Sequence, residues 1–146
     1  MKIITSLFLL LFFSSVYYGC VNSGNTSVAL LSGNYKYALT DSLNAKLVEG
    51  VITFKDFTDN KISGTYTKEK IMTGNFPGYS TMQGNFGGTF DAKENKGFIN
   101  TNPKIADRNI FINFEIKNDS LTGEWSLSTM MGIQNHGNFY AVKMLK

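Results

Sequence analysis

Short runs of residues that alternate between apolar and polar side chains constrain this 146-residue chain more than any other feature. A period of two is typical of a β-strand with one buried and one solvated face. In the run 120–128, for example, Leu121, Trp125 and Leu127 fall on one face and polar residues fall on the other. No stretch of residues 33–146 has convincing helical periodicity. The predicted strands are residues 33–40, 46–57, 61–68, 82–91, 96–101, 109–117, 120–128 and 137–144.

The order of these strands predicts how they pair. Each is followed by a link of turn-forming residues, so consecutive strands are expected to form antiparallel hairpins. Eight such strands predict an all-β fold, an eight-stranded antiparallel up-and-down β-barrel, with a two-sheet β-sandwich as the alternative. We favour the barrel because closure leaves no exposed sheet edge in a chain whose single cysteine allows no internal disulfide.

Seven Gly-x-aromatic triplets support a closed barrel. Residues i and i+2 of a strand lie on the same face, so each triplet places a glycine beside a large ring. Around Trp125 that face is the apolar one, which predicts that the rings lie inside the barrel over bare glycine backbone. The triplets are Gly33/Tyr35, Gly64/Tyr66, Gly74/Phe76, Gly84/Phe86, Gly88/Phe90, Gly123/Trp125 and Gly137/Phe139.

The N-terminal residues have the layout of a secretory signal peptide. Lys2 precedes an apolar run, residues 3–13, that is too short to span a membrane. Cys20 follows Gly19, and this pattern resembles the signal of bacterial lipoproteins, in which such a cysteine is lipidated and begins the mature chain. We therefore expect three segments: a signal peptide at 1–19, a tether at 20–32 beginning with lipidated Cys20, and a barrel domain at 33–146.

This reading predicts a protein of the bacterial cell envelope that meets the membrane only through its lipid anchor. A soluble secreted or periplasmic protein is the alternative. The formal net charge of +3 is small and dispersed along the chain, so we expect no nucleic-acid partner.

The links between the predicted strands alternate in length. In an up-and-down barrel every second link lies at the same end, so all the long links are expected to share one end, named here the long-loop end. Long connections are more often functional than tight hairpins. The tether and the C-terminus are then expected at the opposite, short-loop end. The short links are residues 58–60, 92–95 and 118–119, and the long links are 41–45, 69–81, 102–108 and 129–136.

Four stretches resemble the calycin-like barrels, the group that includes lipocalins and avidins. They are "SGNYKY" at 32–37, "ISGTYT" at 62–67, "LTGEWS" at 121–126 and "HGNFYAVK" at 136–143. The resemblance spans roughly residues 33–144. It implies a barrel that binds a small, mostly apolar ligand in its cup.

Catalytic chemistry has little support in the sequence. His136 is the only histidine and Cys20 is expected to carry lipid, so neither a hydrolytic triad nor a histidine-rich metal site can be assembled. The glycines occupy strand positions and do not precede a helix, so they form no phosphate-binding loop. We expect no enzyme activity, no cofactor and no metal.

Three hypotheses for the function follow. The first is a barrel that binds a small apolar or amphipathic ligand at its long-loop end. The second is a protein-binding or hydrolase-inhibitor module that uses the same loops, and the third, least favoured, is an enzyme. The first predicts an internal cavity of several hundred cubic ångströms, whereas the second predicts a filled barrel with an exposed loop surface. The candidate ligand-binding residues are Trp125, Tyr66, Phe86 and Phe114 in the cup, Phe76, Tyr79, Met130 and Met131 at the lip, and His136 at the rim.

Overall fold

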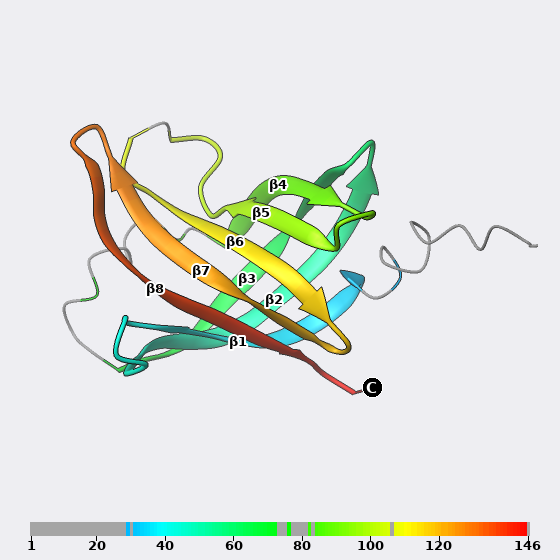
Figure 1. Cartoon of the computed structure of the whole chain (residues 1–146), viewed down its shortest axis with the longest axis horizontal. Coiled ribbons are helices and arrows are strands. Elements are labelled where there is room, and N and C mark those ends of the chain that lie inside the picture. Colours follow the sequence, from blue (N-terminus) through cyan, green and yellow to red (C-terminus); the bar gives the residue numbers. More distant parts are fainter. Residues whose placement is uncertain are drawn as a thin grey trace, which may run out of the picture.

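A closed antiparallel barrel of eight strands, paired in chain order, makes up the computed structural model (Figure 1). The structure describes residue 29, residues 31–72, residues 76 and 82, and residues 84–105 and 107–145. Closure between the first and last strands confirms the up-and-down barrel and excludes the β-sandwich. The strands are β1 (Gly33–Thr40), β2 (Lys46–Thr58), β3 (Lys61–Ile71), β4 (Asn85–Asp91), β5 (Lys96–Asn100), β6 (Asn109–Lys117), β7 (Ser120–Thr129) and β8 (Gly132–Lys143).

Most strand boundaries agree with the predicted ones, but the long link predicted at 129–136 was wrong. β8 already begins at Gly132, so β7 and β8 form a tight hairpin with Met130 and Met131 at its tip. The backbone of Gly132 has a φ of +91°, which lets it close the turn in the left-handed region. Residues 134–136 are polar, which is typical of a loop, but Asn135 and His136 pair with β7.

The links fall into two groups at opposite ends of the barrel. At the left of Figure 1, the long-loop end holds residues 41–45, the described residues 101–105, 107 and 108, and the hairpin tip. The start of β1 and the end of β8 lie at the short-loop end, where the Met144 amide donates a hydrogen bond of 2.9 Å to the Asn34 carbonyl.

Aromatic rings and glycines alternate across the interior of the barrel, as the triplets predicted. Because many of the rings face a glycine on a neighbouring strand, they can fill the interior without crowding. The Phe54 and Phe86 rings meet edge to face at 5.2 Å, and the rings of Phe90 and Phe114 stack at 6.3 Å. Cross-strand neighbours form two rows: Gly33–Phe54–Gly64–Phe86, and Phe90–Gly97–Phe114–Gly123–Phe139.

The contact between Gly97 and Phe114 shows why these positions require glycine. A Cβ atom on Gly97 would overlap Cζ of the Phe114 ring and lie 2.9 Å from its Cε2 atom. The ring therefore lies directly over the bare Cα of Gly97, so any larger residue at 97 would have to displace it.

Residues that precede β1 pack against the short-loop end of the barrel. Leu31 is completely buried in the core, so the packed domain begins before Gly33. Lys143 donates a hydrogen bond of 3.5 Å from Nζ to the carbonyl of Ala29. The same ammonium lies 5.7 Å from the centre of the Tyr35 ring, which packs edge to face on Phe54 at 5.8 Å.

Burial of Tyr35 is expected to make the folded state less stable at alkaline pH. Burial, and secondarily the negative charge of Asp119, raise the pKa of Tyr35 from 10.0 to about 12. The folded state therefore keeps this proton between pH 10 and 12, where the unfolded chain releases it. The stabilisation is complete below pH 10 and is lost as the pH rises toward 12, by an amount on the order of 2 kcal/mol. Urea titrations at pH 9 and pH 11.5 should show a smaller loss for Tyr35→Phe than for the native chain; equal losses would contradict this assignment.

Candidate functional site

The long-loop end of the barrel is plugged by two side chains from the β3–β4 link. Phe76 and Met82 are both buried. The Phe76 ring packs edge to face on Trp125 with 5.3 Å between ring centres, and the Trp125 indole donates a 2.7 Å hydrogen bond from Nε1 to the Thr40 carbonyl. Lys68 Nζ donates to the Met82 carbonyl at 2.8 Å, and burial lowers the pKa of this lysine. These contacts cover the place where a ligand would enter the cup.

A cavity lined by described residues beneath the plug is too small for an organic ligand. Its volume is about 10 Å³, close to the minimum for one water molecule, whereas ligand pockets usually exceed about 300 Å³. Within it, Tyr66 donates a 3.1 Å hydrogen bond from its hydroxyl to the Thr101 carbonyl. The buried Tyr37 hydroxyl has no hydrogen-bond partner among the residues that the structure describes. The cavity is lined by Tyr37, Ile52, Tyr66, Met82, Ile99, Thr101, Ile112 and Phe139.

The predicted cup residues are buried, and they help to fill the interior. Trp125, Tyr66, Phe86 and Phe114 are each at most 4% exposed. Phe76 joins them from the loop. The structure thus brings five of the predicted site residues into the aromatic core.

The other predicted site residues lie elsewhere. Met130 and Met131 are 89% and 85% exposed at the tip of the β7–β8 hairpin. His136 is exposed on the outer wall and faces Ser126 across the strand pair. Tyr79 and Cys20 lie outside the described residues.

Hydrogen bonds from the Met130 and Met131 amides help to hold the hairpin tip in place. The Met130 amide donates to Asp107 Oδ1 at 3.0 Å, which ties the tip to the β5–β6 link, and the Met131 amide donates to Thr129 Oγ1 at 3.1 Å. Among the tip residues only Gly132 has a positive φ, so the turn geometry favours glycine at position 132. The same geometry does not require methionine at positions 130 and 131. The two methionines therefore stand in solvent without a structural reason.

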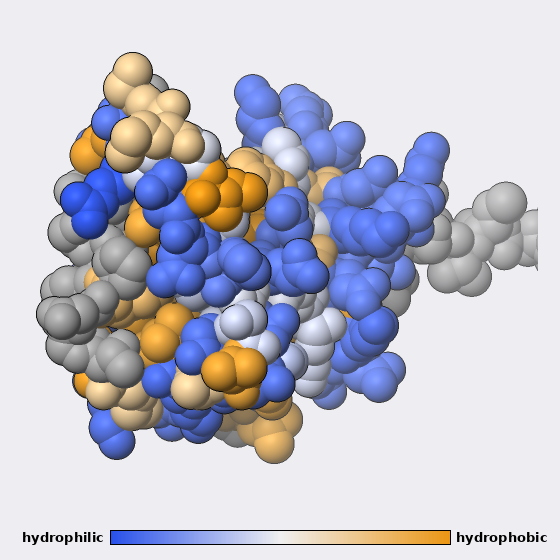
Figure 2. Space-filling view, turned by 60° about the vertical axis from the view of Figure 1, so that its left-hand side comes forward, coloured by the Kyte–Doolittle hydropathy of each residue, from blue (hydrophilic) through white to orange (hydrophobic). Residues whose placement is uncertain are grey.

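Other exposed apolar side chains gather at the same end. Leu43 is 86% exposed in the β1–β2 link, and Ile133 is 66% exposed just after the tip. Figure 2 shows apolar surface among hydrophilic groups at this end, whereas the opposite end is mostly hydrophilic. Sequence reasoning missed Leu43, Ile71 and Ile105, although an aliphatic residue within a polar link is a usable signal. We name this set the loop-end apolar surface: Leu43, Ile71, Ile105, Met130, Met131 and Ile133.

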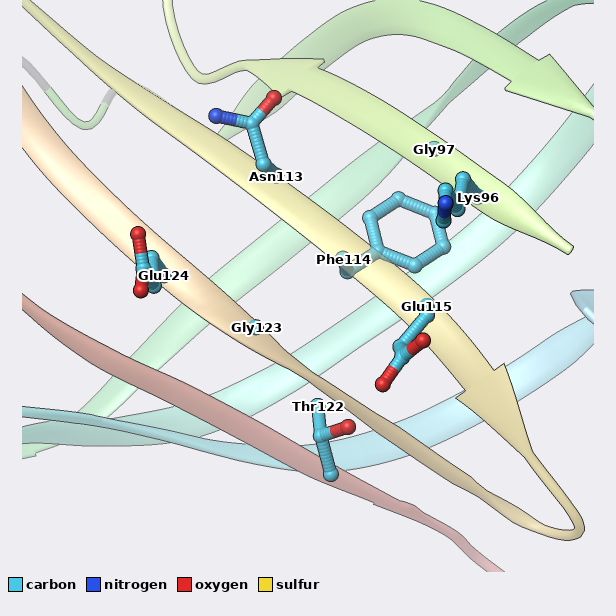
Figure 3. Close-up of a pocket in the computed structure, with 8 residues that line it drawn as sticks. All are labelled: Lys96, Gly97, Asn113, Phe114, Glu115, Thr122, Gly123 and Glu124. Carbon is cyan, nitrogen blue, oxygen red and sulfur yellow. The ribbon is translucent and has the colours of Figure 1, made fainter. Parts of the chain in front are cut away.

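A separate groove of about 360 Å³ crosses the outer wall over β5, β6 and β7 (Figure 3). Its polar side chains are spread along the three strands and do not converge on one point. Lys117 forms an ion pair with Glu115 and lowers the pKa of that carboxyl group. The groove therefore offers no focused binding chemistry. Its lining residues are Lys96, Gly97, Asn113, Phe114, Glu115, Thr122, Gly123 and Glu124.

Two kinds of feature are absent from the part of the chain that the structure describes. No group of three or more His, Cys, Asp or Glu side chains there could hold a metal ion. No helix there is long and apolar enough to cross a membrane.

The fold defines a class of protein without naming a family. A closed, eight-stranded antiparallel up-and-down barrel with an aromatic core is consistent with a calycin-like fold. No protein-family model matches the chain, and no curated protein matches it either.

Proposed function

We propose that this protein is an exported, lipid-anchored barrel whose long-loop end binds a partner protein. The observation that carries the proposal is the β7–β8 hairpin, which presents Met130 and Met131 to solvent on top of a filled barrel. The proposal includes no catalytic role and no cofactor.

The properties of the hairpin suit protein recognition. Methionine side chains are flexible and polarizable, so they adapt to an apolar cleft on a partner. Contiguous exposed apolar groups on a soluble domain are typical of interaction sites. The backbone beneath Met130 is fixed by Asp107, so little ordering of the loop would oppose binding.

The small-ligand cup implied by the calycin resemblance has weaker support. It shares the buried aromatic core, but a ligand would need to displace Phe76 and Met82, and the cavity beneath them holds only about 10 Å³. A protein partner requires no such rearrangement, and we therefore favour it.

The proposed lipid anchor determines which way the long-loop end faces. The described chain begins at the short-loop end, so lipid on Cys20 would attach the barrel to the bacterial envelope by that end. The loop-end apolar surface would then face away from the membrane.

Site-specific photo-crosslinking tests the proposal. In one variant a photoreactive phenylalanine analogue replaces Met131. In the matched control it replaces Lys93, which is exposed in the β4–β5 link at the opposite end of the barrel. In cells that naturally produce the protein, illumination should join the Met131 variant to one discrete protein, identified by mass spectrometry.

The Lys93 control distinguishes specific crosslinking at the hairpin from nonspecific labelling. The Lys93 variant should give no such adduct. Equal labelling from both positions, or no discrete adduct from position 131, would contradict a protein-binding role for the hairpin.

A further inference from the structure

The last outward-facing residues of β8 are apolar, where a solvated barrel wall is normally polar. Side chains that point outward from a strand with one solvated face are usually hydrophilic. Tyr140, Val142 and Met144 occupy alternate positions on β8 and its extension and are 43%, 57% and 47% exposed. Leu145 follows and is 95% exposed. We name these four residues the β8 stripe.

The β8 stripe runs to the place where the described chain begins. β8 pairs with β1, and the Met144 amide is bonded to the Asn34 carbonyl at 2.9 Å. Lys143, between two stripe residues, donates a 3.5 Å hydrogen bond to the carbonyl of Ala29. The end of the stripe therefore lies beside the segment that leads to Cys20.

The length of that segment limits how far the barrel can stand from its anchor. Residues 20–28 separate the proposed lipid from Ala29, and nine residues reach at most about 30 Å when fully extended. An anchored barrel is thus held within roughly one barrel length of the bilayer, with the β8 stripe on the near side.

Basic side chains accompany the stripe. Lys36 is exposed on β1 and faces Val142 on one side and Val51 on the other. Glu49, also on the outer wall, is held by Lys46 at 2.6 Å. Aliphatic groups, a tyrosine and the exposed Lys36 on one surface suit the interface of an anionic bilayer, where the apolar groups enter the headgroup layer and the ammonium group meets phosphate.

We propose that the β8 stripe rests on an anionic lipid surface and orients the anchored barrel, with its long-loop end directed away from the bilayer. This inference rests on the lipid anchor of the proposed function. The contact is weak by itself, because only four side chains take part. The anchor makes it effective by keeping it close to the membrane.

Methionine oxidation measures this orientation with native residues. The chain from Cys20 onward is coupled through Cys20 to a maleimide-headgroup lipid in vesicles of phosphatidylglycerol and phosphatidylethanolamine. The reference is the same chain in solution with its thiol blocked. Hydrogen peroxide transfers one oxygen atom to a thioether sulfur and leaves as water, and mass spectrometry gives the rate at each methionine.

We expect vesicle coupling to slow oxidation of Met144 at least threefold and to leave Met130 and Met131 unchanged. Met82, which is 3% exposed, should react slowly in both samples and report that the fold is intact. Val142→Glu with Leu145→Glu should restore the rate at Met144, whereas the matched change Ile133→Glu at the other end should not.

Three results would overturn the proposal. The first is an unchanged oxidation rate at Met144, and the second is slowed oxidation of Met130 and Met131 instead. The third is protection of Met144 from oxidation that grows with protein density on the vesicle, which would indicate contact between copies of the protein. Because the coupling is chemical, the test does not depend on lipidation in cells. If the chain is not lipidated in cells, the proposed anchor is wrong, but the protection of Met144 measured on vesicles would still show that the β8 stripe contacts lipid.

Discussion

A single methyl group added at Gly123 is expected to lower the free energy of unfolding by about 4 kcal/mol or more. In Gly123→Ala the new Cβ would overlap the Asn113 carbonyl oxygen and lie 2.7 Å from the Phe114 Cα. Both atoms belong to the backbone of β6, which is paired on both sides and cannot move alone. The loss would be a large share of the roughly 5–15 kcal/mol that stabilises a typical domain.

Gly87→Ala is the matched control for this change. Gly87 also lies in a strand, but a Cβ there would meet only Pro103 at an ordinary 3.7 Å, so its effect should stay within about 0.5 kcal/mol. Urea titration monitored by the fluorescence of Trp125 measures both variants. A cost below about 1 kcal/mol for Gly123→Ala would show that β6 and β7 are less closely packed than described.

The second large effect concerns binding. Met130→Asp combined with Met131→Asp should weaken affinity for the partner identified by crosslinking by about 100-fold, because two exposed apolar anchors become charged groups that must be desolvated. The free energy of unfolding should hardly change, since both side chains are almost fully exposed. Isothermal titration calorimetry measures the affinity.

Met144→Asp provides the comparison at the other end of the barrel. It introduces one carboxylate at an exposed methionine just after β8 and should leave partner affinity in solution unchanged. If the double hairpin variant binds as tightly as the native chain, the hairpin is not the anchor of the interface.

The fold could be predicted from local sequence because each strand carries its own signal. The alternation around Trp125 marks an inner and an outer face, and the triplets place glycine and ring on the inner one. Gly123 and Phe114 then face each other in the structure as neighbours in one row.

The beginning of β8 could not be predicted in this way. Its first residues extend the hairpin, where Ile133, Gln134 and His136 are all exposed. No face is buried there, so no alternation is required and the pattern resembles a loop. Strand pairing with β7, a tertiary contact, decides the structure instead.

The candidate site was predictable in composition but not in arrangement. Phe76 and Met130 are both apolar residues in links at the same end, and their local sequences do not show which one turns inward. The answer depends on Trp125, whose ring provides a partner for Phe76, and on Asp107, which holds the Met130 backbone outside. Both partners are distant in sequence, so the plug and the exposed tip become evident only in three dimensions.

The central claim is that side chains fill this barrel and leave recognition to its long-loop end. Native mass spectrometry of the chain from residue 21 onward, purified without denaturation, tests it most directly. We predict the mass of the polypeptide alone. A stoichiometric small molecule of several hundred daltons that stays bound through purification and is lost on unfolding would contradict the filled interior and restore the ligand-binding cup.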